Sequence, residues 1–236
     1  MKVDGYHGRV AVVTGAGRGI GRRIAERFAE QGARVAGLDL AEPEVPGVLG
    51  IAADVTDPGA VDAAFDRAET ELGPVELLVL NAGIFIVEPF ASTTLDQWER
   101  TMAVNLTGPF LCAKRALPGM TETGYGRVLA IGSSAGVNGG ANSCAAYAAS
   151  KAGLMCMAKS IANEYARAGI TSNALAPTLI DTPMMDEQPE GIADRIPVGR
   201  LGTPDDIADL VTYLCSAHAG FVTGEVVDVN GGFLVD

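Results

Sequence analysis

Short apolar segments alternate with longer amphipathic segments along the whole chain. Most of the apolar segments are continuous in Val, Ile, Leu and Ala, which is typical of strands buried on both faces of a parallel sheet. Helices are expected in the intervals. This order of elements predicts an α/β fold with a doubly wound, seven-stranded parallel sheet and helices on both faces. The predicted strands cover residues 9–14, 34–39, 48–53, 76–80, 127–132, 171–176 and 225–229.

Three of the expected helices begin with capping signals. Asp57–Pro58 and Thr203–Pro204 each place a side-chain oxygen before a proline at the first helical position. Thr94 and Gln97 have the spacing of a capping box for the helix that follows them. No repeat, low-complexity tract or linker interrupts the pattern, so we expect one domain over residues 1–236.

The composition fits a protein with a large core. The chain has 236 residues, 48% of them hydrophobic, and its net charge at pH 7 is −12. This negative charge argues against nucleic acid and anionic membranes as partners. The apolar segments are too short to span a bilayer, and the first residues lack the apolar stretch of a signal peptide. We therefore expect a soluble, cytoplasmic protein.

Potential metal ligands are few and scattered. The four cysteines form no C-x-x-C pair, and the only histidines of the sequence are His7 and His218. This pattern argues against a metal site and against Ser-His or Cys-His nucleophilic catalysis. Scattered thiols that act as small buried hydrophobic groups suit a reducing cytoplasm.

A glycine-rich turn, TGAGRGIG at residues 14–21, directly follows the first predicted strand and runs into a helix. Gly15 permits the sharp turn, while Gly19 and Gly21 let the backbone approach a diphosphate. The N-terminus of the helix supplies unpaired N–H groups for the same anion. The turn predicts a Rossmann-type dinucleotide site.

The end of the second strand bears on the choice of dinucleotide. Asp39 lies there, 18 residues after Gly21, where a carboxylate can accept hydrogen bonds from ribose hydroxyls and would repel the extra phosphate of NADP. No Arg or Lys follows it in LAEPEVPG, and Arg18 in the glycine turn is the one residue that could neutralise that phosphate. We expect NAD as the cofactor, with NADP as the alternative.

Further polar motifs follow at the same predicted edge of the sheet. Asp54 comes after the third strand and Asn81-Ala82-Gly83 after the fourth, although either motif alone could simply cap a turn. In the helical segment AAYAASKAG, Tyr147 and Lys151 are four positions apart and therefore on one face. Alone, this pair could equally be a packed tyrosine beside a solvated lysine.

Taken in order, these motifs resemble the short-chain dehydrogenase/reductase family, in its single-domain branch. The resemblance extends through Asn105, APTLIDTP at residues 176–183 and GRLGTPDDIA from residue 199, so it runs essentially end to end. It implies a catalytic tetrad of Asn105, a serine, Tyr147 and Lys151. The cofactor-binding residues expected from the motifs and the resemblance together are Gly15, Arg18, Gly19, Ile20, Asp39, Asp54, Val55, Asn81, Ala82, Gly83, Tyr147, Lys151, Pro177, Ile180 and Thr182.

The resemblance also implies a homotetramer or homodimer, paired through the helix around Asn105 and the helix that carries Tyr147. Two positions depart from the family pattern. Thr178 follows Pro177 where the family often has glycine, which should reshape the turn near the nicotinamide, and Asn230 replaces an aspartate at a position that we interpret as structural.

The identity of the catalytic serine is open. The common family spacing, thirteen residues before Tyr147, gives Ser134. The strand register of VLAIGSSAG gives Ser133 with Gly136, followed by a loop one residue longer. Loop length varies more easily than the end of a buried strand, so we favour Ser133.

The expected chemistry is the interconversion of a carbonyl and an alcohol, with a hydride moved to or from the nicotinamide and a proton on the oxygen. A free tyrosine has a pKa near 10, and a nearby cation lowers that pKa. We predict that Lys151 does this to Tyr147 and that the serine holds the substrate oxygen. Pro109 cannot donate a backbone hydrogen bond to the carbonyl of Asn105, so we predict a break in the helix there.

The substrate is expected to be a small hydroxy or keto compound of apolar to amphipathic character. Residues 180–200 mix Met184 and Met185 with Asp186, Glu187 and Glu190 and are predicted to form a lid with an apolar inner side, the alternative for the acidic part being a disordered surface loop. Residues 84–86 are predicted to form an apolar wall. Three functions are considered: an NAD-dependent dehydrogenase of secondary alcohols, an NADPH-dependent 3-oxoacyl-acyl-carrier-protein reductase, and a non-catalytic dinucleotide sensor. Asp39 and the acidity of the chain favour the first over the second, and the presence of both Tyr147 and Lys151 disfavours the third.

Overall fold

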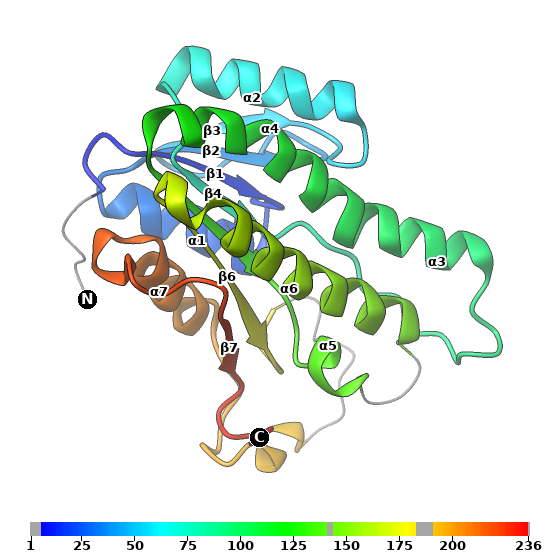
Figure 1. Cartoon of the computed structure of the whole chain (residues 1–236). Coiled ribbons are helices and arrows are strands. Elements are labelled where there is room, and N and C mark those ends of the chain that lie inside the picture. Colours follow the sequence, from blue (N-terminus) through cyan, green and yellow to red (C-terminus); the bar gives the residue numbers. More distant parts are fainter. Residues whose placement is uncertain (1–5, 141–143, 183–190, 236) are drawn as a thin grey trace.

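The computed structural model describes residues 6–140, 144–182 and 191–235, and over these ranges the chain forms a seven-stranded parallel sheet (Figure 1). The strand order is β3-β2-β1-β4-β5-β6-β7, so the order reverses between β1 and β4. Such a switch point places ligands at the carboxyl ends of the central strands. The strands are β1 Val10–Thr14, β2 Arg34–Asp39, β3 Val48–Ala52, β4 Leu77–Leu80, β5 Gly126–Ile131, β6 Ile170–Pro177 and β7 Val226–Val229.

Helices cover both faces of this sheet, as Figure 1 shows. One apolar core lies between the sheet and α2, α4 and α6, and a second lies between the sheet and α1 and α7. The helices are α1 Gly19–Glu30, α2 Pro58–Leu72, α3 Leu95–Met102, α4 Gly108–Thr123, α5 Ala135–Asn138, α6 Ala145–Tyr165 and α7 Pro204–Cys215, with short 3₁₀ turns at Ala166–Ala168, Ile192–Arg195 and Ala217–Ala219. In the described ranges no helix combines the length and the apolar character needed to cross a membrane.

The apolar pattern of the sequence predicted this architecture correctly. Every strand end lies within one residue of its predicted position, and all eight residues of β6 are buried, as expected for a strand covered on both faces. The predicted caps are present as well. Asp57 accepts hydrogen bonds from Gly59 and Ala60, and Thr94 and Gln97 form a reciprocal capping box.

The predicted break in the helix around Asn105 takes the form of a π-helical turn. Residues Ala103–Thr107 form this turn between α3 and α4, and the Gly108 N–H donates to the carbonyl of Ala103. Pro109 follows at the start of α4 and has no N–H of its own. The wider π turn is therefore the local solution to a missing backbone donor.

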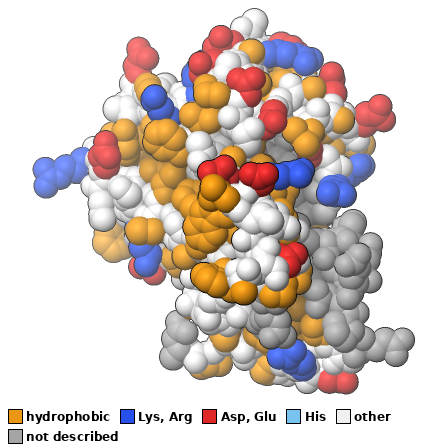
Figure 2. Space-filling model, turned by 90° about the vertical axis from the view of Figure 1, so that its right-hand side faces the viewer, with side chains coloured by type: hydrophobic (Ala, Val, Ile, Leu, Met, Phe, Trp, Pro, Cys, Tyr) orange, Lys and Arg blue, Asp and Glu red, His pale blue; other side chains and the backbone are white. Residues whose placement is uncertain are grey.

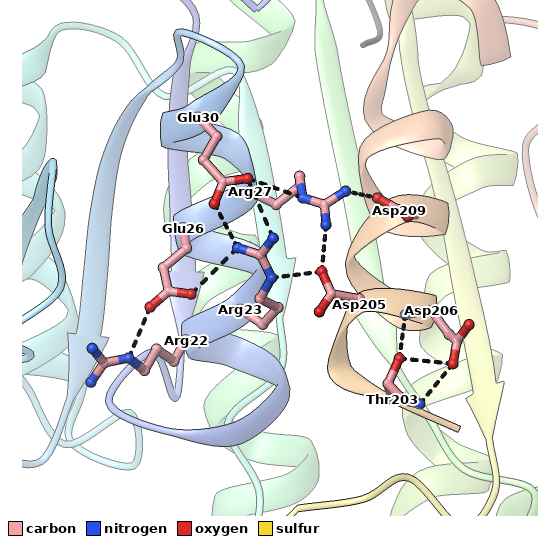
Figure 3. A network of polar contacts seen from close by, with 9 residues as sticks. All are labelled: Arg22, Arg23, Glu26, Arg27, Glu30, Thr203, Asp205, Asp206 and Asp209. Carbon is pink, nitrogen blue, oxygen red and sulfur yellow. Dashed lines mark hydrogen bonds and ion pairs between the residues drawn. The ribbon is translucent and has the colours of Figure 1, made fainter. Parts of the chain in front are cut away.

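Ion pairs join the helix after the glycine turn to the helix near the C-terminus (Figure 3). Arg23 of α1 lies 2.8 Å from Glu30 of the same helix and 2.8 Å from Asp205 of α7. Arg27 of α1 pairs with Asp205 and Asp209 of α7. The hydrogen bonds from Arg23 lower the pKa of the Glu30 and Asp205 carboxyls. Since these carboxylates are about half exposed, each pair contributes on the order of 0.5 kcal/mol to stability.

Candidate active site

A cleft of about 490 Å³ opens at the carboxyl edge of the central strands. The segments that follow β4, β5 and β6 form its floor, since the carboxyl ends of parallel strands meet at one edge of a sheet. The cleft therefore lies where the strand order predicts a ligand. Most of the expected site residues line it, namely Ile20, Asn81, Gly83, Ser133, Ser134, Tyr147, Lys151, Pro177, Ile180 and Thr182.

The glycine turn is packed too closely for side chains at two of its positions. Gly15 has a φ of +66°, and a Cβ on Gly21 would lie 2.1 Å from the Gly15 carbonyl oxygen. Asn81 holds the turn from the next strand, because its Nδ2 donates to the carbonyls of Thr14 and Gly15 at 2.9 and 3.1 Å. The Asn81 and Ala82 N–H groups both donate to the Thr14 hydroxyl at 3.0 Å.

Asp39 lies against this turn. The N–H of Gly17 donates to one carboxylate oxygen of Asp39 and the N–H of Leu40 to the other, both at 2.8 Å. The carboxylate is thereby fixed beside the turn, in the position expected to meet a ribose. Arg18 is exposed and is the N-cap residue of α1, with no side-chain capping bond.

Asp54 and Val55 follow β3 and face different surroundings. Asp54 is exposed, and one of its oxygens accepts hydrogen bonds from the N–H and the hydroxyl of Thr56, at 2.9 and 2.7 Å. Val55 is buried, and it packs so closely that a Cβ on Gly108 would lie 2.8 Å from its side chain. Asp54 thus shapes a turn at the surface.

Asn105 is fully buried and is bonded on every side. Its Oδ1 accepts from the Ile84 N–H at 2.8 Å, and its Nδ2 donates to the Ile84 carbonyl and to the Ser150 hydroxyl at 2.9 and 3.1 Å. Ser150 in turn donates to the Tyr147 carbonyl at 2.7 Å. Asn105 therefore ties the loop after β4 to the helix that carries Tyr147. The sequence analysis missed Ser150, whose one signal is its place between Tyr147 and Lys151.

Tyr147 and Lys151 both point into the cleft from α6. The Tyr147 and Phe85 rings pack in a T-shaped arrangement with a centroid distance of 4.8 Å. Lys151 Nζ lies 5.7 Å from the centre of the Tyr147 ring and donates to the Ile131 carbonyl at 2.7 Å. The contact between Phe85 and Tyr147 gives the predicted apolar wall a definite place beside the phenol.

The two candidate serines face different partners. Ser133 is a hydrogen-bond partner of the Tyr147 phenol. Ser134 is buried and donates its hydroxyl to the hydroxyl of Thr178 at 2.9 Å. The geometry thus brings Ser133, the serine favoured from the strand register, to Tyr147.

Burial dominates the proton affinities in the cleft. It raises the pKa of the Tyr147 phenol, the hydrogen bond with Ser133 lowers that pKa, and Cys144 raises it further. Burial also lowers the pKa of Lys151 to about 8. The shift in the pKa of Tyr147 is therefore opposite to the lowering expected from Lys151 in the chain by itself, because burial dominates and the opposing effect comes from Ser133.

The segment after β6 crosses over the glycine turn. Leu179 adopts a left-handed backbone with a φ of +47°, and Ile180 pairs with Gly202 in a short parallel bridge. The methyl group of Thr182 would lie 3.6 Å from a Cβ on Gly19. Pro177, Ile180 and Thr182 are thus brought to the cofactor side of the cleft, while the predicted lid residues Met184 and Met185 lie outside the described residues.

Comparisons with known proteins agree with this geometry. A family model described as enoyl-(acyl carrier protein) reductase matches residues 15–234. The 3-oxoacyl-[acyl-carrier-protein] reductase MabA of Mycobacterium tuberculosis is 42% identical over 228 residues, which cover 95% of this chain and 92% of MabA. The 3-oxoacyl-[acyl-carrier-protein] reductase FabG of Escherichia coli is 38% identical over 239 residues, which cover 96% of this chain and 98% of FabG.

A solved structure is similar over the whole fold. The crystal structure of 3-ketoacyl-(acyl-carrier-protein) reductase from Brucella melitensis, complexed with NADH, superposes with a TM-score of 0.94 at 32% sequence identity and covers 98% of this chain and 100% of its own. Motifs, fold and relatives lead to one assignment. The chain belongs to the short-chain dehydrogenase/reductase family of oxidoreductases.

Proposed function

We propose that this chain reduces the 3-oxo group of an acyl thioester to a secondary alcohol. The observation that carries the proposal is the match to MabA and FabG, both named 3-oxoacyl-[acyl-carrier-protein] reductases, over more than nine-tenths of each chain. The cleft supports it, because a phenol, a hydroxyl and an ammonium group converge there beside an apolar wall.

The cofactor that we propose is a nicotinamide dinucleotide, and the glycine turn fits its diphosphate. Gly15 and Gly19 would hold the diphosphate at the N-terminus of α1, and the segment after β6 would border the nicotinamide. When bound, this group supplies the hydride. NAD is proposed over NADP because the fixed carboxylate of Asp39 would lie beside the adenosine ribose and repel a phosphate there. Arg18, which is exposed, is the residue that would support NADP.

Each polar residue of the cleft has a role that its contacts support. Tyr147, whose phenol is protonated at neutral pH like any tyrosine and whose pKa burial raises further, would give its proton to the carbonyl oxygen. Ser133 holds that oxygen through its own hydroxyl. Lys151, whose Nζ lies 5.7 Å from the centre of the Tyr147 ring, would replenish the proton donor. Asn105 would tie Ile84 in the loop after β4 to Ser150 of the catalytic helix.

A homotetramer or homodimer is proposed as the working assembly. Large hydrophobic side chains are exposed on the helices that the family pairs, with Trp98 on α3 37% exposed and Phe110 on α4 49% exposed. Figure 2 shows hydrophobic side chains gathered over one face of the molecule. Burial of such a patch between copies is the ordinary reason for its presence on a soluble chain.

A second candidate function is the NAD-dependent oxidation of small secondary alcohols. Asp39 agrees with it as it does with the first proposal, since it argues for NAD in both. The net charge of −12 favours it too, because an acidic surface repels an acidic carrier protein. A non-catalytic dinucleotide sensor is disfavoured because Tyr147 and Lys151 both face the cleft.

The test compares turnover with NADH and with NADPH on three substrate classes, namely acetoacetyl thioesters, diketones and simple ketones. Turnover is measured from the change in absorbance of the reduced cofactor. The proposal expects the highest kcat/KM with the thioester and NADH, and a loss of about a thousandfold or more in Tyr147→Phe. Asp39→Ser should raise kcat/KM for NADPH by about tenfold or more relative to NADH. Comparable turnover of a simple ketone would shift the assignment to the second function, and an unchanged Tyr147→Phe would refute the mechanism.

A further inference from the structure

The charged residues that the structure describes in the cleft lining are cations, although the chain as a whole is acidic. Among the cleft-lining residues that the structure describes, Lys151 and Arg195 are charged and none is an acid. The whole chain carries a net charge of −12. Against the net negative charge of the chain, these two described cations would attract an anionic group of a ligand.

The two cations are not equivalent. Lys151 is 4% exposed, lies beside Tyr147, and already donates to the Ile131 carbonyl. Arg195 is exposed at the end of the 3₁₀ turn Ile192–Arg195, and within the described ranges it forms no ion pair with a carboxylate. Asp194, the adjacent acid, does not line the cleft. The guanidinium of Arg195 therefore has N–H donors that can bind a ligand group other than the reacting carbonyl.

Arg195 is held over an aromatic ring. Its guanidinium carbon lies 5.6 Å from the centre of the Phe233 ring, which also lines the cleft. Stacking on a ring leaves the N–H edge of a guanidinium directed outward, where it can bind a carboxylate or phosphate with two hydrogen bonds. The arginine is thus preorganised for an anion.

The platform below this pair is built by the C-terminal turn. The Val198 N–H donates to the Gly231 carbonyl at 3.2 Å, and a Cβ on Gly231 would lie 2.7 Å from the Ile196 side chain. Asn230 holds the turn from inside, since it accepts from the Gly232 N–H and donates to the Leu234 carbonyl. Asn230 thus has the structural role expected for it, since these hydrogen bonds fix the turn that carries Phe233.

We propose that Arg195 binds an anionic group that the substrate carries away from its reacting carbonyl. The inference rests on the proposed ketone reduction and names its substrate class more closely. Two sources supply this chemistry: the phosphate of a pantetheine arm that bears the acyl thioester, and the carboxylate of a free keto acid. Both meet the same guanidinium, so matched substrates must separate them.

The experiment uses two pairs of substrates, each consisting of a neutral member and a member that carries one anionic group. The first pair is acetoacetyl-pantetheine and acetoacetyl-4′-phosphopantetheine, and the second is the methyl ester of 4-oxopentanoate and 4-oxopentanoate itself. For each pair, the ratio of kcat/KM for the anionic over the neutral member is measured with NADH in the parent, Arg195→Gln, Arg195→Lys and Arg167→Gln. Arg167 is an exposed arginine in the turn Ala166–Ala168, outside the cleft lining, and its variant removes the same unit of charge.

The ratio for one pair should fall by about tenfold in Arg195→Gln, be partly retained in Arg195→Lys, and be unchanged in Arg167→Gln. Rising ionic strength should lower the same ratio in the parent, since the group is exposed. A fall confined to the first pair assigns the phosphate, and a fall confined to the second assigns the carboxylate. Equal effects of Arg195→Gln on both members of both pairs would overturn the inference, whereas absence of turnover with every ketone would instead overturn the proposed reduction.

Discussion

Replacement of Lys151 by methionine tests how much free energy the burial of one ammonium group costs. Burial lowers the pKa of this lysine from its ordinary 10.5 to about 8. This difference in pKa corresponds to about 3 kcal/mol, by which the free energy of unfolding is reduced while the lysine is charged. Methionine removes that cost, but it also removes the 2.7 Å bond to the Ile131 carbonyl, which is worth about 1–3 kcal/mol once the carbonyl is left buried. The two terms nearly cancel at neutral pH.

The decisive quantity is therefore how stability changes with pH. The pKa of Lys151 is lower in the folded than in the unfolded chain, so the penalty is fully present below about pH 8 and disappears as the pH rises to about 10.5. Over this interval the free energy of unfolding of the parent should gain about 3 kcal/mol relative to that of Lys151→Met. The two curves should run parallel below about pH 7.

Urea unfolding at a series of pH values measures this difference, with Lys159→Met as the control. Lys159 lies on the same helix, two turns further on, but its side chain is exposed. Its replacement should leave the pH dependence of the parent unchanged. If the difference between the parent and Lys151→Met stays constant from neutral to alkaline pH, the reasoning from burial is refuted.

Three further predictions concern packing, electrostatics and assembly. Ser134→Ala and Thr178→Val should show a coupling of about 1 kcal/mol in a double-mutant cycle of urea unfolding, because each removes the same 2.9 Å bond, and additive effects would contradict this. Arg23→Ala should lower the unfolding free energy by about 0.5–1 kcal/mol at pH 7. That effect should fade in thermal scans as the pH falls through the lowered pKa of Asp205, and persistence in acid would count against the pairing. Phe110→Asp should shift sedimentation toward smaller species, and an unchanged profile would move the proposed interface elsewhere.

The fold could be read from the sequence because its signals are local. Continuous apolar strands, a glycine turn between the first strand and helix, and N-caps such as Asp57 each act over a few residues. Site residues that are positioned by the ends of strands could be predicted from the sequence for the same reason. Asp39 ends β2 and Asn81 follows β4, so the sheet alone carries both to the glycine turn.

Contacts between segments far apart in the sequence could not be predicted in this way. Ser134 and Thr178 are 44 residues apart, and their hydrogen bond decides which of two adjacent serines is left to face Tyr147. Arg195 and Phe233 come from two separate turns that meet only because the glycines of the C-terminal turn allow close packing. No periodicity or spacing encodes such a meeting, since it depends on the path of both backbones.

The proton affinities of Tyr147 and Lys151 show the same limit in energetic form. Four-residue spacing fixes how near the ammonium lies to the phenol, but it says nothing about how much water either group keeps. Burial favours the neutral form of each group, which raises the pKa of the phenol and lowers that of the ammonium. At neutral pH the phenol therefore holds its proton, which is the state required to protonate a ketone. Burial thus opposes loss of the phenol proton in the chain by itself, and oxidation of an alcohol would need additional positive charge beside the phenol to release that proton.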